Sequence, residues 1–446
     1  MTMTSVPGEF HQGSFWIPTP PPPLLPLEGA STCDVVIIGG GYVGLNAALR
    51  LKEAGLDAVV LEQDFCGVGA SGRNAGHIGS TIGKDIYTCL KTFGPKKGLA
   101  LARLGDAAVE HFNRRVGDLE LACDYERTGN AVVGVHPSQK DVLKRSVDLV
   151  LKHGLKFQYM DEAEMARRGL PPAFLFGALE TEGGVINPGK LVLGLRQAAI
   201  AAGVRIHEKT AVTDLREDAR GVVARTSRGE IRAASALIAV NAYAPETLGL
   251  LKAKILPVRV TQFATRPLTQ QERDAVGWNG REGVYTLHES LENYRWTADN
   301  RIVGGSKEVS YAYGSRLGPG RQPRIFNLLE TAFRDRFPML RSVAIEHWWG
   351  GWVAMTLDFL PSFGRLGPKS AIHYYTGCNG HGVPQGFMMG DAAADHLLGR
   401  RSEAIEVLKR LEIPLPPEPL RYAVFQAINQ ALLAKDRHLD RSLQQP

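Results

Sequence analysis

Three glycines, Gly39, Gly41 and Gly44, stand between an apolar run and a stretch with helical spacing. In a G-x-G-x-x-G arrangement the first glycine permits a tight turn, the second lets the backbone approach a pyrophosphate, and the third allows close helix packing. Glu62 lies roughly 20 residues further on, where a carboxylate can accept hydrogen bonds from a ribose. The spacing predicts a dinucleotide site for FAD or NAD; the alternative is a glycine-rich turn without a ligand.

The same stretch of sequence predicts the two strands and the helix that hold the glycines and Glu62 in place. Residues 35–38 are an apolar run typical of a buried strand, and Leu45 and Leu49 share one face of a predicted helix. Gly55 is a helix stop before a second apolar run at 58–61. The pattern therefore predicts one β-α-β unit with the glycines in its first turn.

A second group of candidate residues lies just beyond Glu62, in the stretch GASGRNAGH at 69–77. The stretch offers little side chain to bury and several backbone N–H groups without an evident partner. Such a loop can wrap a pyrophosphate, and Arg73 can donate charge-assisted hydrogen bonds to it or to a flavin. For Arg73 and Asn74 alone, a solvated surface loop is an equally good interpretation.

The middle of the chain predicts more elements of the same kind. A helix is expected from an Asn187 cap to Gly203, followed by a strand at 204–208. A hairpin near Arg228 and an apolar strand at 236–245, broken at Asn241, follow. This block is expected to add strands to the sheet of the β-α-β unit.

The pattern changes between about residues 255 and 345. Antiparallel strands such as NYRWTADNRIVGG and an amphipathic helix that ends before Pro338 are expected there. Residues 17–30 are proline-rich and predict an extended arm or linker, and RYAVFQAINQALLAKD near the end predicts a packing helix or, alternatively, a membrane-surface helix.

Composition limits the class of protein. Hydrophobic residues at 44% and charged residues at 22% are typical of a globular protein, and the 52 basic and 46 acidic residues are dispersed, which argues against nucleic-acid binding. Five widely spaced cysteines without a C-x-x-C pair argue against a disulfide framework or a metal site, so none is expected. No apolar stretch of spanning length is present, and a cytoplasmic location is expected.

Four motifs together resemble a known family. They are VVIIGGGYVGL, GASGRN, WGGWVAMTLDFLPSFGR (349–365) and NGHGV (379–383). In this order they are similar to motifs of the FAD-dependent amine and amino-acid oxidoreductases of the D-amino-acid oxidase and glycine oxidase superfamily, most of all the γ-glutamylputrescine oxidase branch. The resemblance implies FAD as the cofactor, carried from its pyrophosphate towards its isoalloxazine ring by the loop 69–77.

The resemblance also implies which residues line FAD. The expected set is Gly39, Gly41, Tyr42, Gly44, Glu62, Gly69, Ala70, Ser71, Arg73, Asn74, Ala75, Gly76, His77, Val212, Asn241, Gly380, His381, Gly382 and Val383. The glycine turn at 380–382 is expected to offer N–H groups to the pyrimidine edge of the flavin. Relatives often carry Gly or Gln where Ala75 and His77 stand, and His77 is expected to be a non-covalent neighbour.

The chemistry follows from what the chain lacks. No second glycine fingerprint and no C-x-x-x-x-C motif is present, so electrons are expected to come from an organic substrate rather than a pyridine nucleotide. The expected reaction is hydride transfer from the carbon next to an amine nitrogen to flavin N5, followed by hydrolysis of the imine. The amine must be neutral when it reacts, which favours an apolar or aromatic pocket.

Candidate pocket residues are Trp349, which begins the W-G-G string, His288, Tyr294 and Arg259. Aromatic rings can surround an ammonium group, and Arg259 or Arg295 can bind a carboxylate as a fork. For each aromatic residue core packing is the simpler interpretation, and for each arginine a surface or strand-edge position is equally compatible.

These interpretations combine into an α/β fold: a glutathione-reductase-like FAD domain with an interleaved, largely antiparallel substrate domain. The expected ranges are 1–29 for the proline-rich arm, 30–115, 180–250 and 345–400 for the FAD domain, 116–179 and 251–344 for the substrate domain, and 401–446 for a helical tail. The expected function is oxidation of a C–N bond of an amine or amino acid, with γ-glutamylated or N-substituted amines favoured over simple D-amino acids, and with O₂ or another electron acceptor. The alternatives are an amino-acid dehydrogenase that passes electrons to a membrane carrier, and a flavin-binding protein without turnover.

Overall fold

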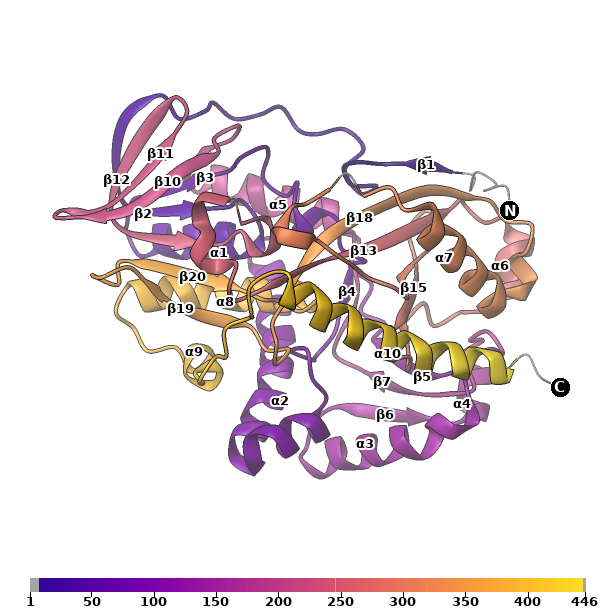
Figure 1. Ribbon diagram of the computed structural model, residues 1–446. Coiled ribbons are helices and arrows are strands. Elements are labelled where there is room, and N and C mark those ends of the chain that lie inside the picture. The colour runs from indigo at the N-terminus through magenta and orange to yellow at the C-terminus, as the bar shows by residue number, and fades with distance from the viewer. Residues whose placement is uncertain (1–7, 245, 319, 444–446) are drawn as a thin grey trace.

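A computed structural model describes residues 8–244, 246–318 and 320–443. Two sheets dominate it, and Figure 1 shows them side by side, with the smaller one at the left and the larger one at the right. The chain passes between the two sheets several times. The interleaved α/β arrangement expected from the sequence is therefore confirmed.

The smaller, eight-stranded sheet contains the predicted β-α-β unit. Its central strands pair in parallel, whereas the hairpin strands and β19 are antiparallel. The strands are β2 (Gly29–Ile38), β3 (Ala58–Leu61), β9 (Arg205–His207), β10 (Val212–Asp218), β11 (Gly221–Thr226), β12 (Gly229–Ile238), β19 (Ser362–Leu366) and β20 (Ile372–Thr376). The hairpin expected near Arg228 connects β11 and β12, and the strand expected at 236–245 ends at Ile238.

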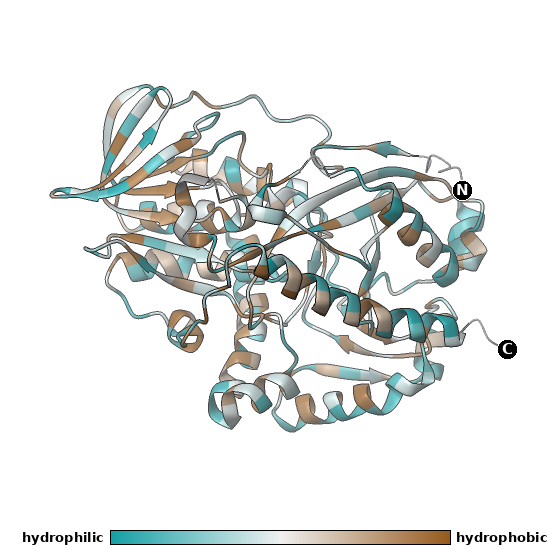
Figure 2. Ribbon diagram, viewed as in Figure 1, coloured by the Kyte–Doolittle hydropathy of each residue, from teal (hydrophilic) through white to brown (hydrophobic). Residues whose placement is uncertain are grey.

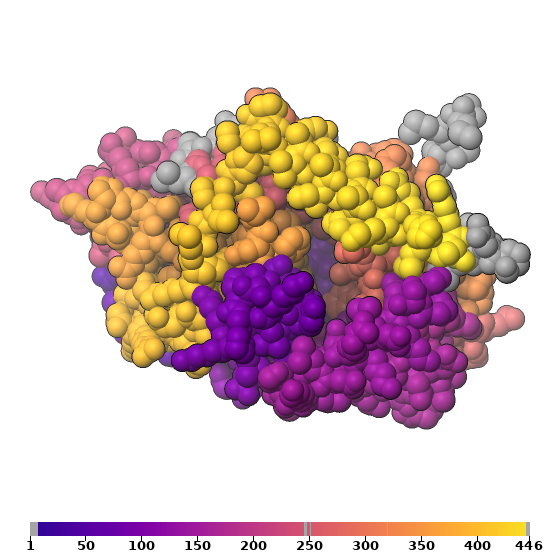
Figure 3. All heavy atoms as spheres, turned by 60° about the horizontal axis from the view of Figure 1, so that its bottom comes forward, coloured from indigo at the N-terminus to yellow at the C-terminus, as the bar shows by residue number. Residues whose placement is uncertain are grey.

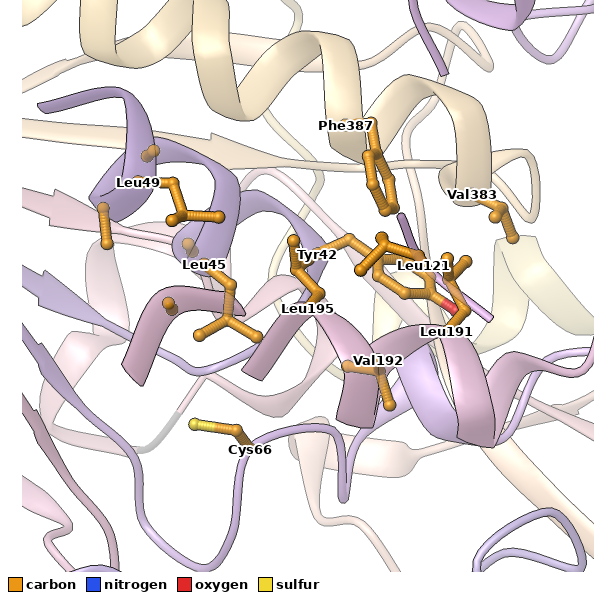
Figure 4. Close-up of a cluster of buried hydrophobic side chains, with 14 of the residues drawn as sticks. Tyr42, Leu45, Leu49, Cys66, Leu121, Leu191, Val192, Leu195, Val383 and Phe387 are labelled. Atoms are coloured by element: carbon orange, nitrogen blue, oxygen red, sulfur yellow. The ribbon is translucent and has the colours of Figure 1, made fainter. Parts of the chain in front are cut away.

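Four helices accompany this sheet: α1 (Tyr42–Glu53), α2 (Ile86–Asp118), α5 (Pro188–Ala201) and α8 (Gly382–Leu397). Parallel strands are buried on both faces, which explains their continuous apolar runs. Figure 4 shows side chains of α1, α5 and α8, among them Leu45, Leu195 and Phe387, pointing into one shared cluster. This packing fixes the first turn of α1 and that of α8 relative to each other.

Most strands of the larger, ten-stranded sheet lie in the ranges expected for the substrate domain, and this name is used below for the sheet and the helices packed on it. Its strands are β1 (Glu9–Phe10), β18 (Ile345–Met355), β13 (Leu256–Thr265), β16 (Ile302–Ser306), β15 (Glu292–Trp296), β14 (Gly283–Thr286), β5 (Asn130–Gly134), β7 (Phe176–Glu180), β6 (Phe157–Met160) and β17 (Ser310–Tyr311). Residues 345–355 were expected in the FAD domain. They lie in this sheet instead, because β18 pairs antiparallel with β13 along its whole length.

One face of the larger sheet packs against α7 (Pro323–Arg336) in a cluster that includes Phe263, Tyr294 and Phe333. Near β5–β7, the other face is covered by α3 (Lys140–Lys152); elsewhere this face turns towards the FAD domain.

The remaining helices are α4 (Glu162–Arg167), α6 (Gln270–Val276), α9 (Glu403–Leu408) and α10 (Leu420–Leu443), and a two-stranded sheet is formed by β4 (His77–Ile78) and β8 (Gly184–Val185).

The chain has a helix, α10, where a C-terminal helix was expected, and it lies along the outside of the larger sheet's domain (Figure 1). Figure 3 shows a hollow between α10, α2 and the magenta part of the chain that includes α3.

In Figure 2 the tip of the β10–β11 hairpin is hydrophilic, whereas the strands around β2 are hydrophobic. Within the described residues, none of the helices has the length and apolar character needed to span a membrane.

Candidate functional site

The glycine turn has the geometry of a dinucleotide site. Gly39 has a positive φ of 108°, which a side chain rarely tolerates, and a Cβ at Gly44 would overlap the carbonyl oxygen of Gly39. A Cβ at Gly41 would lie 2.9 Å from the Ser71 hydroxyl. The turn therefore presents bare backbone at the N-terminus of α1, where the free N–H groups and the helix dipole favour a phosphate.

Glu62 ends the second strand and is buried beside this turn. Its carboxylate accepts hydrogen bonds from the backbone N–H groups of Gly40 at 2.8 Å and Asp64 at 3.0 Å. Burial raises the pKa of Glu62, and the two N–H donors act against that rise. The carboxylate is thus held in place at the cavity wall, where a ribose hydroxyl can donate to it.

The loop 69–77 is organised by Ser71 and Asn74. The Ser71 hydroxyl accepts from the N–H of Tyr42 at 3.1 Å, which ties the loop to α1. The Asn74 side chain donates to the carbonyl oxygens of Ala70 and Ser71 and accepts from the N–H of Gly76. These bonds hold the loop in a compact form around the cavity, so its small residues can face a ligand.

Arg73 is held by backbone carbonyl groups of three segments. Its guanidinium donates to the carbonyl oxygens of Val68 at 2.6 Å, Gln12 at 2.7 Å and Gly350 at 3.4 Å. It therefore connects the loop, the N-terminal arm and β18. Arg73 does not line the cavity along the glycine turn, and its role in the structure is to position the loop.

The far end of the cavity is formed by the turn before α8. Asn241, at the end of the β12 segment, accepts from the N–H of Gly377 at 3.1 Å and donates to the Cys378 sulfur at 3.2 Å. Gly380, Gly382 and Val383 line the cavity at the N-terminus of α8. Two helix N-termini, those of α1 and α8, thus point into one cavity, which favours an anionic ligand at both ends.

The structure brings most of the expected cofactor residues together in this cavity. Those that line it are Gly39, Gly41, Tyr42, Glu62, Gly69, Ala70, Ser71, Asn74, Val212, Asn241, Gly380, Gly382 and Val383. Those that do not are Gly44, Arg73, Ala75, Gly76, His77 and His381. Gly44 and Arg73 act through packing and hydrogen bonds behind the lining.

His77 is turned away from the cavity. Its ring stacks on Tyr285 with centroids 4.5 Å apart, and its Nδ1 lies 2.8 Å from the Asn130 side-chain oxygen. Burial lowers the pKa of His77 to about 3, so the ring is neutral at ordinary pH. His77 therefore joins the loop to the larger sheet.

Several lining residues carry no sequence signal. Tyr243, Tyr375, Cys378 and Thr210 line the cavity from segments outside the motifs, and Val353 lines it from within the motif at 349–365. Val353 follows the W-G-G string, so that string could have suggested it. The others come from loop and strand ends that only the fold brings together.

These residues fit FAD. Gly41 and Gly69 leave space that a Cβ would fill, since a Cβ at Gly69 would contact the Tyr243 ring at 3.4 Å. A carboxylate stands at the ribose position, and the cavity continues from the α1 turn to Val353 on the larger sheet. The bound ligand would thus lie with one end against the substrate domain.

The face of the larger sheet that turns towards the FAD domain carries polar side chains in register. Gln262 pairs with Trp349 on one side and Gly305 on the other, Gly305 pairs with Asn293, and Asn293 pairs with Tyr285. Among the residues that the structure describes, the side-chain oxygens of Gln262 and Asn293 are buried without a hydrogen-bond partner. Two unpaired acceptors on one face suit a ligand with N–H donors.

Glu180 is a buried carboxylate near the same face. It accepts from the N–H of Ser80 at 2.8 Å, and burial raises its pKa to about 7. Within the described part of the chain, no basic side chain lies within 4.0 Å of it. Glu180 therefore titrates near neutral pH in a region of low polarity.

His288 and Tyr294, expected in the substrate pocket, lie on the opposite face. The Tyr294 hydroxyl donates to Glu292 at 3.0 Å, and its ring packs against Phe337. His288 lies between Glu292 and Asp440 of α10. The physical reason is strand alternation: Glu292, Tyr294 and Trp296 point to α7, whereas Asn293 and Arg295 point the other way.

The cluster of His288, Glu292 and Asp440 could hold a metal ion by geometry alone. Lys307 and Arg336 already fill it, with Lys307 Nζ at 2.8 Å and an Arg336 nitrogen at 2.9 Å from Asp440. Because two cations compensate the two carboxylates, the cluster is a structural ion network.

Trp349 and Arg259 complete the expected pocket set. The Trp349 indole is buried, stacks on Phe15 and donates to the Arg73 carbonyl oxygen at 3.0 Å. Arg259 is buried with its guanidinium 5.8 Å from the Trp352 ring centroid. Neither side chain is among the residues that line the cavity.

Comparison with known proteins decides the family. Residues 34–396 match the family described as DAO, FAD dependent oxidoreductase. The chain belongs to this family. It is an enzyme of the FAD-dependent oxidoreductase class, and FAD is its cofactor.

Individual relatives agree with this assignment. Gamma-glutamylputrescine oxidoreductase of Escherichia coli is 34% identical over 84% of this chain and 86% of its own length. Glycine oxidase of Geobacillus kaustophilus is 26% identical over 84% of this chain and 95% of its own. The crystal structure of glycine oxidase from Geobacillus kaustophilus has the same fold, with a TM-score of 0.72 at 20% identity over 83% of this chain and 96% of its own. L-proline dehydrogenase from P. horikoshii has a TM-score of 0.71 at 20% identity over 85% of this chain and 96% of its own.

Proposed function

We propose that this enzyme oxidises a C–N bond of an amine, and that a γ-glutamylated or N-substituted amine is preferred over a simple D-amino acid. The observation that carries the proposal is the pair of unpartnered amide oxygens, Gln262 Oε1 and Asn293 Oδ1, on the sheet face towards the FAD domain. Their strands are separated by β16, which sets them roughly 10 Å apart. Amide oxygens accept N–H donors without adding a charge that would keep an amine protonated.

The similarity to gamma-glutamylputrescine oxidoreductase supports the same substrate class. Bound FAD would supply a hydride acceptor for the carbon next to the nitrogen, and hydrolysis of the resulting imine by water would give a carbonyl compound and ammonia or an amine. The chain's part is to position and desolvate the amine. Gln262 and Asn293 orient its N–H groups, and the buried sheet face excludes water.

Proton removal from the substrate ammonium needs a group that is ionised near neutral pH. Glu180, with its pKa of about 7 and its position near the sheet face that carries Asn293, suits this task. We infer that Glu180 helps to keep the amine neutral. The electron acceptor that reoxidises the enzyme is O₂ or another carrier, and an amino-acid dehydrogenase with a membrane acceptor is the second candidate.

The test is an anaerobic titration of the purified holoenzyme, followed by its visible flavin absorption. γ-Glutamylputrescine, N-methyl amino acids and D-amino acids are added separately, and bleaching by one of the first two classes is expected. Gln262→Leu removes one acceptor at similar size and should raise the KM for that substrate about tenfold, since one hydrogen bond to a buried group is lost. Bleaching by D-amino acids alone would overturn the preference, and a flavin that no amine bleaches would overturn the reaction.

A further inference from the structure

A second cavity, of about 300 Å³, lies under the N-terminal arm. Its walls come from residues 15–18 of the arm, the segment 124–126, the start of α5 and the segment 295–299. No residue lines both this cavity and the FAD cavity. It is therefore a separate space, behind the loop 69–77, to which Trp16 is joined by a hydrogen bond from its Nε1 to the Asn74 carbonyl oxygen.

Arg295 is the residue in this cavity that lacks a partner. Its side chain is buried, with the whole residue 3% exposed, and its Nε and one terminal nitrogen have no hydrogen bond. The other terminal nitrogen makes one long bond of 3.4 Å to the Trp296 carbonyl oxygen. The guanidinium lies 4.6 Å from the centroid of the Trp16 ring. A buried guanidinium with unused donors is costly unless an anion pairs with it.

The carboxylates of the cavity do not supply that anion, because each pairs with another cation. Asp124 lies 2.7 Å from Lys190, and Glu126 accepts from Arg281 at 2.6 and 2.9 Å. Asp299 accepts from Arg301 at 2.8 Å. In the described part of the chain no carboxylate lies within 4.0 Å of the Arg295 nitrogens. Among the described residues, the Arg295 guanidinium is thus left without an ion-pair partner.

The other residues of the cavity wall indicate which chemical class of ligand fits the cavity. The start of α5 lines the cavity with its N-cap residue Asn187 and with Lys190, and a helix N-terminus favours negative charge. Phe15, Trp16 and Pro18 form an apolar side. We propose that this cavity binds a small organic carboxylate, its carboxylate on Arg295 and its aromatic or aliphatic part against the N-terminal arm. The guanidinium fork matches a carboxylate with two parallel hydrogen bonds.

The test measures binding to the holoenzyme by calorimetry. The probes are benzoate, phenylacetate and indole-3-acetate, and benzamide serves as the uncharged counterpart of benzoate. At least one carboxylate is expected to bind without a change in the visible flavin spectrum, since the cavity is separate from the FAD cavity. Benzamide should bind at least about tenfold more weakly, because a charge-assisted pair is lost.

Two variants make the result specific to this cavity. Arg295→Gln removes the charge, and Ala298→Trp, at an exposed position of the wall, fills the space while keeping Arg295. Both should weaken the carboxylate about tenfold or more, and Arg225→Gln on the exposed surface of β11 should not. The proposal is overturned if no probe binds below about 10 mM. It is also overturned if Ala298→Trp folds and binds the carboxylate like the unmodified protein, or if every binding event alters the flavin spectrum.

Discussion

The indole Nε1 of Trp349 donates a hydrogen bond to the carbonyl oxygen of Arg73 over 3.0 Å. This bond joins β18 of the larger sheet to the loop 69–77 of the FAD domain. The Arg73 side chain adds a second link between the two segments, because its guanidinium donates to the carbonyl oxygen of Gly350 in β18. Two motifs almost 280 residues apart in sequence thus form one joint, which sets the distance between the cofactor loop and the substrate face.

Breaking this joint should weaken FAD binding. In Trp349→Phe the ring is kept in part and the N–H is lost, so the Arg73 carbonyl oxygen loses its partner at a cost of about 1 kcal/mol. The Kd for FAD should rise about fivefold, measured by titrating apoprotein with FAD. Trp278→Phe is the matched control, because Trp278 is buried on the α7 side of the sheet, away from the loop. Equal FAD affinity in both variants would contradict the prediction.

The glycine turn gives a second prediction with an internal control. Gly44 and Gly117 both lie in helices, α1 and α2, but a Cβ at Gly44 would overlap the Gly39 carbonyl oxygen, whereas a Cβ at Gly117 meets nothing within 4 Å. Gly44→Ala should push α1 away from the turn and abolish retention of FAD through gel filtration. Gly117→Ala should retain FAD and raise the free energy of unfolding by about 0.5 kcal/mol. A Gly44→Ala protein that keeps full flavin content would refute the close-packing argument.

Glu180 predicts a pH dependence of stability. Its carboxyl ionises at about 7 in the folded protein and at an ordinary 4.5 when unfolded, so the native state binds the extra proton between these values. The resulting stabilisation is fully present below about pH 4.5 and is lost as the pH rises through about 7, a change of up to about 3 kcal/mol.

Glu180→Gln removes this titration while keeping an acceptor for the Ser80 N–H. Relative to the unmodified protein, the variant should therefore gain stability as the pH rises from about 5 to about 8, measured by urea unfolding at both values. Glu182→Gln, on the exposed turn beside it, should show no such trend. A constant difference between Glu180→Gln and the unmodified protein would mean that Glu180 has an ordinary pKa.

Site residues could be predicted where their pattern lies in one continuous stretch of sequence, and not where only the fold brings them together. The turn at Gly39 and Gly41 and the carboxylate of Glu62 belong to one continuous β-α-β unit, so spacing alone located them. Tyr294 was expected in the substrate pocket, but it lies on the α7 face of the larger sheet. Alternation along β15 separates Tyr294 from Asn293, but both faces of the larger sheet are buried, one by α7 and one by the FAD domain. Hydrophobicity therefore could not say which face meets the cofactor.

Gln262 was missed because a single glutamine in a strand has no distinctive spacing. Its significance comes from Trp349 and Asn293, which the sheet register brings beside it from distant parts of the chain. The unpartnered Arg295 shows the same limit. Its charge is visible in the sequence, but its isolation depends on Lys190, Arg281 and Arg301 having taken the nearby carboxylates.

The ion network on the α7 side predicts the opposite pH response to that of Glu180. Burial alone would raise the pKa of Glu292, but the charges of Arg336 and Lys307 lower it to about 2. The pKa of Asp440 is also held well below its usual range, by a hydrogen bond from His288 and by the positive charge of Lys307. Depressed carboxyl pKa values add stability above about pH 4.5, and this stability is lost as the pH falls towards about 2.

Asp440→Asn should uncouple α10 from the substrate domain. The substitution leaves Lys307 and Arg336 with one carboxylate between them, Glu292, at a cost of about 3 kcal/mol in the free energy of unfolding at neutral pH. Limited proteolysis should then cut within 420–443 before the rest of the chain. Lys435→Gln, which removes only a surface pair with Glu289, should change stability by less than about 0.5 kcal/mol and leave the helix protected. If Asp440→Asn resists protease as well as Lys435→Gln does, the network does not hold α10 in place.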